Sequence, residues 1–186
     1  MKSTISIDVD APPELVFRLA HDVERWPRLL PHYVAVRVLA RGDAGTVIAR
    51  FVARREIVPA LGIALPVAWR SRTWNDPATL RLRFVHQGGA TDGMDVTWRI
   101  EPRGAGCRVS IDHEFEPRFA PWATALERFF VRPIAGRTLA TFKAIAEAVA
   151  TAQSGALGTS RPGAIPEGVG GVSQIDAMAS SRIEHR

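Results

Sequence analysis

At 186 residues, with 46% hydrophobic and 23% charged positions, the chain has the composition of one globular domain and too little length for two full ones. Its net charge of +5 comes from arginines scattered along the sequence, without a helix-turn-helix, zinc-finger or RNP-type motif, so we expect no nucleic-acid binding. It contains no apolar run long enough for a membrane span, no signal-peptide pattern and only one cysteine, Cys107, so the sequence predicts a cytoplasmic protein without an internal disulfide.

The N-terminal part of the chain predicts one strand and two short helices. Residues Thr4–Asp10 alternate apolar and polar side chains, which is typical of a strand with one exposed face. Pro12 and Pro13 then open a helix that ends near His21, because the first helical turn does not need their missing N–H groups. A second short helix is predicted over about Val23–Leu30.

Six further strands follow as a meander, separated by turns rich in glycine, asparagine and aspartate. They are predicted at Val34–Ala40, Thr46–Ile57, Ile63–Asn75, Thr79–His86, Asp92–Glu101 and Arg108–Glu116. The connection Val58–Leu65 contains Pro59 and Gly62, so we expect an irregular segment there that could form a lid.

The longest helical pattern runs from Pro121 to Ala152, with apolar residues at three- and four-residue steps. Pro133 lacks the N–H that would bond to the Phe129 carbonyl, so a kink or a fresh helix start is expected near Phe129–Pro133. A bent helix leaves room for a cavity beneath one of its ends. From residue 153 the sequence becomes rich in glycine and serine and contains no aromatic residue, which predicts a domain over 1–152 and a disordered tail over 153–186.

The apolar parity of the strands assigns one face of the sheet to the core. Its polar exceptions are Ser71, Thr73, His86 and His113, and no carboxylate lies among them. The pattern therefore predicts no metal site and no acid/base carboxylate pair, and the absence of glycine-rich phosphate motifs predicts no cofactor. Aromatic side chains with a few polar groups are typical of a pocket for a hydrophobic ligand. We expect it to be lined by Phe51, Trp69, Thr73, Phe84, His86, Met94, Trp98, Phe130 and Phe142. His113 is either a polar group of this pocket or a core histidine bonded to a neighbouring hydroxyl.

Three stretches of the N-terminal region, together with the order of the elements, resemble the helix-grip superfamily. They are Ala11–Phe17, Asp22–Pro27 and Leu30–Tyr33. This superfamily includes START domains, polyketide cyclases and coenzyme-Q-binding proteins, and the resemblance, over Thr4 to about Ala150, is nearest to bacterial polyketide aromatase/cyclases. It implies an α+β fold in which a seven-stranded antiparallel sheet wraps around a long C-terminal helix, with two short helices after the first strand.

The resemblance also implies functional residues. Tyr33 matches the family's tyrosine at the tunnel mouth, Trp69 and Ser71 match an aromatic and a serine on one pocket strand, and Thr73 stands where the aromatase/cyclases have an arginine. The implied function is binding of a polyketide-like or aromatic molecule, with cyclase/dehydratase chemistry by Tyr33, Ser71 and His113 as one reading. A non-catalytic lipid or quinone carrier is the alternative, and a partner-binding module with a vestigial pocket is a third.

Arginines gather on the opposite, outer face of the sheet. Six of them fall on three consecutive strands, at Arg50, Arg54, Arg70, Arg72, Arg81 and Arg83, while carboxylates concentrate on the first, sixth and seventh strands. Such a face either keeps the sheet soluble or docks an acidic partner, for which an acyl carrier protein would be the natural choice.

Overall fold

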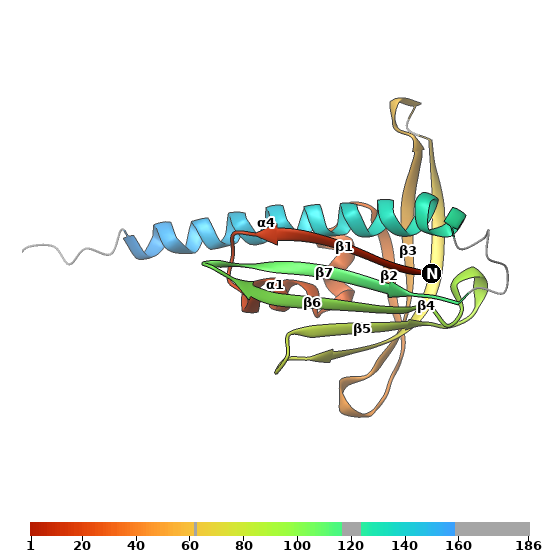
Figure 1. Cartoon of the computed structure of the whole chain (residues 1–186), viewed down its shortest axis with the longest axis horizontal. Coiled ribbons are helices and arrows are strands. Elements are labelled where there is room, and N and C mark those ends of the chain that lie inside the picture. The colour runs from red at the N-terminus through yellow and green to blue at the C-terminus, as the bar shows by residue number, and fades with distance from the viewer. Residues whose placement is uncertain (62, 117–123, 159–186) are drawn as a thin grey trace, which may run out of the picture.

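A computed structural model describes residues 1–61, 63–116 and 124–158. It contains one seven-stranded sheet of strand order β1-β7-β6-β5-β4-β3-β2, with every neighbouring pair antiparallel. The strands are β1 (Lys2–Val9), β2 (Tyr33–Arg41), β3 (Val47–Val58), β4 (Ile63–Asp76), β5 (Arg81–His86), β6 (Asp95–Arg103) and β7 (Gly106–Glu114). The long helix α4 (Arg132–Gly158) lies along the sheet in Figure 1. The expected helix-grip arrangement is confirmed.

Short helices join β1 to the opposite edge strand β2. They are α1 (Pro13–Ala20), the single turn η1 (Val23–Arg25) and α2 (Trp26–Leu29). The Asp22 side chain accepts a hydrogen bond from the Glu24 N–H at 3.2 Å, so η1 begins with one of its free N–H groups satisfied. The predicted second helix is thus two short pieces rather than one.

In place of the kink or fresh helix start expected near Phe129–Pro133, the helical residues are continuous from 124 onward and include a π-helical segment. A π-helical segment, η5 (Glu127–Val131), precedes the regular turns that begin at Arg132, next to Pro133. A wider π turn accommodates the residue that cannot donate a backbone hydrogen bond. Helix α4 continues to Gly158, past the end expected at Ala152, and residues 159–186 of the predicted tail lie outside the described part of the chain. No described helix combines the length and the apolar character needed to cross a bilayer.

The segment Val58–Leu65 is not the irregular connection that its proline and glycine suggested. Strands β3 and β4 remain paired as far as Val58 and Ile63, with a short turn, η3 (Pro59–Leu61), after Val58. β-Branched Ile57, Val58 and Ile63 favour the extended backbone. The result is a long hairpin that projects beyond the sheet in Figure 1.

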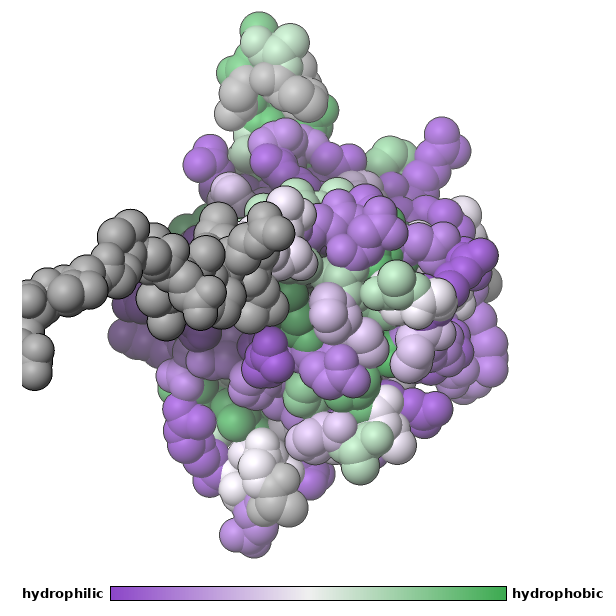
Figure 2. All heavy atoms as spheres, turned by 90° about the vertical axis from the view of Figure 1, so that its left-hand side faces the viewer, coloured by the Kyte–Doolittle hydropathy of each residue, from purple (hydrophilic) through white to green (hydrophobic). Residues whose placement is uncertain are grey.

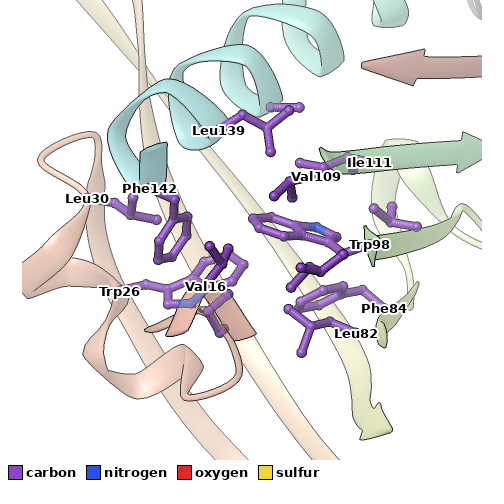
Figure 3. Close-up of a cluster of buried hydrophobic side chains, with 14 of the residues drawn as sticks. Val16, Trp26, Leu30, Leu82, Phe84, Trp98, Val109, Ile111, Leu139 and Phe142 are labelled. Atoms are coloured by element: carbon purple, nitrogen blue, oxygen red, sulfur yellow. Dashed lines mark hydrogen bonds between the residues drawn. The ribbon is translucent and has the colours of Figure 1, made fainter. Parts of the chain in front are cut away.

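The core is centred on the indole of Trp26, which comes from the four-residue helix α2. The Trp26 ring lies 5.1 to 6.0 Å, centroid to centroid, from five other aromatic rings. Its Nε1–H donates to the Ala20 carbonyl at 2.9 Å, which satisfies the only polar atom of the side chain. Figure 3 shows Trp26 and Phe142 on one side of the cluster and Trp98 and Phe84 on the other. Aromatic packing therefore joins α2, α4 and the sheet.

Candidate functional site

A cavity of about 230 Å³ lies between the sheet and the beginning of α4. Its wall is drawn from α2, strands β2 to β7, the loop before β6, η5 and the first turns of α4. Most of the residues expected at a pocket do line it: Tyr33, Phe51, Trp69, Phe84, His86, Met94, Trp98, His113 and Phe130. That any of them contacts a ligand stays a prediction.

Three residues expected at the pocket do not line this cavity. Ser71 and Thr73 face the core as predicted and are buried, but neither lies at the cavity wall. Phe142 packs between Trp26 and Trp98, at 6.0 and 5.8 Å between ring centroids. It lies one helical turn beyond Thr138, the last residue of α4 that reaches the cavity, so the path of the helix removes it from the wall.

Other lining residues were missing from the prediction. Trp26, Thr138 and the loop residues Gly88 to Thr91 all contribute to the wall. Gly88 and Gly89 both have φ near +73°, a conformation that other residues rarely adopt, so the double glycine was a local signal for a special turn. Trp26 and Thr138 carried no comparable signal, because their places depend on how α2 and α4 cross the sheet.

One polar group of the cavity wall lies where β2 meets α4. The Thr138 hydroxyl donates to the Ile134 carbonyl at 2.8 Å and lies 2.9 Å from His32 Nε2. Since the hydroxyl has one proton, Nε2 of His32 must be the donor in the second contact. Burial and the nearby Arg137 charge lower the pKa of His32 to about 4, with Glu56 acting in the opposite direction. The histidine is therefore neutral at pH 7.

Tyr33 lies beside this group and faces the cavity. Its ring packs edge-on against Trp26 at 5.1 Å and Trp69 at 5.9 Å. Burial raises the pKa of the Tyr33 phenol far above its ordinary value, and the Thr138 hydroxyl opposes that shift only partly. Tyr33 consequently keeps its proton at any physiological pH and can donate it in a hydrogen bond.

Two imidazoles form the other polar part of the wall. His86 Nδ1 lies 2.9 Å from the Thr91 hydroxyl, and the His86 ring stacks on Trp69 at 5.9 Å. His113 is only 6% exposed, and its Nδ1 has no hydrogen-bond partner among the described residues. The Ser3 backbone hydrogen-bonds to the ring, so only Nδ1 is left without a described partner, and a pocket role for His113 stays a prediction.

Both imidazoles are uncharged at neutral pH. Burial lowers the pKa of His86 to about 4, and the charge of neighbouring His113 contributes. Burial likewise lowers the pKa of His113 to about 4, opposed by the carboxylates of Asp112 and Glu127. Each ring then has one nitrogen able to accept a proton. Within the described ranges, no three histidine, cysteine or carboxylate side chains are grouped so as to hold a metal ion.

The outer face of the sheet carries the predicted arginines on neighbouring strands, but their charges are not all free. Arg50 is directly opposite Arg70 on β4 and Arg37 on β2, so three cations form a row across the sheet. Arg83 instead forms an ion pair with Asp95 of β6, and its guanidinium also lies 5.1 Å from the Trp74 ring centroid. The basic area is thus centred on β2 to β4 and ends at β5.

The family described as polyketide cyclase/dehydrase and lipid transport matches residues 1–149. The chain belongs to this family. It is similar to the granaticin polyketide synthase bifunctional cyclase/dehydratase of Streptomyces virginiae, with 30% identity over 118 residues, 61% of this chain and 36% of that protein. A Streptomyces cyaneus protein named polyketide cyclase is 28% identical over 110 residues, 59% of this chain and 68% of that protein. The chain therefore matches little more than a third of the granaticin protein.

Solved structures with the same fold include two proteins described as aromatase/cyclases or ARO/CYC. The di-domain ARO/CYC BexL from the BE-7585A biosynthetic pathway has a TM-score of 0.59 and 29% identity, covering 77% of this chain and 45% of that one. The Zhui aromatase/cyclase from Streptomyces sp. R1128 has a TM-score of 0.65, covers 79% of this chain and 93% of that one, and at 21% identity shows the fold alone. These likenesses confirm that the chain shares its fold with polyketide aromatase/cyclases.

Proposed function

We propose that the protein binds an aromatic or polyketide-like molecule in the cavity and promotes its cyclisation or dehydration. The observation that carries the proposal is a cavity with aromatic walls in which His113, neutral and almost fully buried, has an unpartnered ring nitrogen. A cavity of about 150 Å³ can hold benzene, so about 230 Å³ has room for a larger ring system or one folded segment of a longer chain. Apolar walls with few polar groups favour such a ligand.

The residues suggest a division of labour in this reaction. A neutral His113 accepts a proton from the carbon between two ketone groups of a poly-β-ketone, and the enolate attacks a second carbonyl to form the C–C bond. Tyr33 donates a hydrogen bond to the oxygen on which negative charge develops. The protonated His113 returns the proton to that oxygen, which leaves a closed ring that carries a hydroxyl group. His113 then removes the second hydrogen of the attacking carbon as a proton and passes it to the hydroxyl, which leaves as water and forms a C=C bond. The walls hold the chain folded and exclude bulk water, which favours one cyclisation over others. Ser71 does not line the cavity and has no part in this scheme.

A non-catalytic lipid or quinone carrier is the second candidate, and one observation favours it. Among the described residues that line the cavity, none is an arginine, lysine, aspartate or glutamate. Thr73, at the position of the family's pocket arginine, is buried outside the wall. A carrier needs only the apolar volume, whereas an enzyme needs the proton acceptor as well.

The row formed by Arg37, Arg50 and Arg70 supports the proposal that the protein, acting as an enzyme, docks an acidic protein partner. Arg37, Arg50 and Arg70 are exposed, and no ion pair joins them to another described residue. Like charges directly opposite each other on a sheet are unfavourable unless an anionic surface covers them. An acyl carrier protein that delivers a tethered polyketide in the cytoplasm is the partner we propose. Arg50→Glu/Arg70→Glu should abolish such binding at low salt. Arg103→Glu/Arg108→Glu, which breaks two ion pairs to Asp8 and lies outside the row, is the charge-matched control.

The deciding experiment compares binding with turnover. Native mass spectrometry of the purified protein identifies any ligand that it carries, and a poly-β-ketone substrate is then assayed with wild type and His113→Gln. We expect His113→Gln to lower turnover at least about tenfold while keeping ligand affinity within about threefold. Binding without turnover by the wild type would favour the carrier, and turnover unchanged in His113→Gln would remove His113 from the chemistry.

A further inference from the structure

Exposed hydrophobic side chains are concentrated at the end of the β3–β4 hairpin. Ile57, Leu61, Ile63 and Leu65 are 52%, 73%, 51% and 49% exposed. In Figure 2 the projecting hairpin carries hydrophobic residues at its end, above a hydrophilic band. Single exposed apolar residues are ordinary, but four on one protruding element form a patch that soluble proteins normally avoid. We call these four residues the hairpin tip.

The hairpin is held at its base rather than free to fold back. The Arg55 Nε–H donates to the Phe129 carbonyl at 2.8 Å, and Glu56 forms an ion pair with Arg137 of α4 at 2.7 Å. Phe129, 55% exposed, adds a further apolar side chain beside this anchor. The tip therefore has a defined direction relative to the body of the protein.

One face of β4 joins the tip to the cavity. Trp69 and Val67 line the cavity, and Leu65 and Ile63 follow at two-residue steps on the same strand. Alternate residues of a strand lie on the same face, so these four side chains form one apolar track from the cavity wall to the tip. An isolated solvent-facing hairpin would need no such continuity.

Arginines that form no ion pair with another described residue lie inward from the tip. Arg54 is opposite Pro66, and Arg50 is opposite Arg70 four residues further in. With a strand rise of about 3.3 Å per residue, Arg54 lies on the order of 10 Å from the end of the ladder at Ile63. Apolar groups of interfacial proteins enter a bilayer by about 5 to 10 Å, so Arg54 would lie at the level of the lipid headgroups.

We propose that the hairpin tip inserts into the surface of an anionic lipid bilayer, with Arg54 contacting the headgroups. A convex apolar tip fits a fluid bilayer, whereas a folded protein partner would need a matching groove. A second copy of the chain is disfavoured, because a two-fold contact through this surface would bring both sets of arginines together. The track along β4 would let a hydrophobic ligand pass between bilayer and cavity. That passage rests on the proposed function, whereas bilayer docking does not.

The test is sedimentation of the full chain with phosphatidylcholine vesicles, with and without phosphatidylglycerol, at low and high salt. We expect binding to the anionic vesicles that weakens with salt. Leu61→Asp should lower it at least about tenfold, because it removes apolar burial and adds a charge. Leu39→Asp is the matched control, since Leu39 is a 50% exposed leucine on β2, and should stay within about twofold. Arg54→Glu should abolish the preference for phosphatidylglycerol.

Three results would overturn the proposal: no vesicle binding at low salt, equal effects of Leu61→Asp and Leu39→Asp, or a dimer in sedimentation velocity that Leu61→Asp dissociates. Binding of a hydrophobic fluorescent probe, measured without vesicles, distinguishes failure of the bilayer-docking proposal from failure of the proposed function. Leu61→Asp should leave probe affinity unchanged, since Leu61 does not line the cavity. If the protein binds vesicles but does not bind the probe, the bilayer-docking proposal stands and the proposed ligand-binding function fails.

Discussion

The neutral state of His113 predicts a specific pH dependence of stability. The pKa of this histidine is about 4 in the folded protein, against an ordinary value of 6.5, because burial disfavours the charged ring. Between these two pKa values the unfolded chain binds a proton that the folded protein excludes. The free energy of unfolding should therefore be unaffected by this group above pH 6.5, and should fall as the pH is lowered from about 6.5 to 4.

The change in the free energy of unfolding can be worked out from the lowered pKa of His113. Each pH unit between the two pKa values is equivalent to about 1.4 kcal/mol for one proton, so going from pH 7 to pH 5 should cost about 2 kcal/mol through His113 alone. In His113→Gln this contribution disappears. The loss of stability between the two pH values should then be about 2 kcal/mol smaller than in wild type, whatever the variant's stability at pH 7.

Urea denaturation followed by tryptophan fluorescence measures the free energy of unfolding of wild type and His113→Gln at pH 7 and at pH 5. Val109→Ala is the control, because it truncates a buried side chain of the same strand without removing a titratable group, and it should keep the wild-type difference. An equal pH dependence in wild type and His113→Gln would show that His113 is not held neutral by burial. It would also remove the main support for His113 as the proton acceptor.

Four further expectations concern the cavity, the chemistry, the core and the tail. Phe84→Arg should weaken binding of a hydrophobic fluorescent probe far more than Arg81→Ala on the outer face, and equal effects would contradict the assignment of the two faces. Tyr33→Phe should reduce turnover of a poly-β-ketone while leaving its dissociation constant nearly unchanged, and unchanged turnover would exclude Tyr33 from the reaction. Phe142→Ala should lower the free energy of unfolding by about 3 to 5 kcal/mol in urea titrations, since its ring fills space in the core, and a loss below about 1 kcal/mol would mean that the site collapses around it. A chain ending at Gln153 should melt within a few degrees of full length, because the neighbouring helical residues are exposed, and a larger drop would mean that the tail packs on the domain.

The order and type of the elements could be predicted from the sequence because they depend on local patterns. Alternating residues identified the strands and their inner faces, glycine and proline identified turns, and Pro133 indicated the irregular helical segment before α4. Most of the cavity wall followed from the same parity, since Phe51, Trp69, Phe84 and Trp98 needed only the knowledge that one face is covered. The hairpin was the exception, because pairing between β3 and β4 outweighed the local effect of a proline and a glycine.

Only the tertiary structure decided which of the inward residues meet the cavity. Trp26 comes from a single turn of helix, yet it became the centre of the core because α2 packs against both β2 and α4. Phe142 and Thr138 are one turn apart on α4, and the crossing of that helix over the sheet put the first in the core and the second on the cavity wall. The pairing of Arg83 with Asp95 likewise depended on strand register. Such relations join residues distant in sequence, so no local pattern contains them, whereas the periodicity of each element is set by its own backbone geometry.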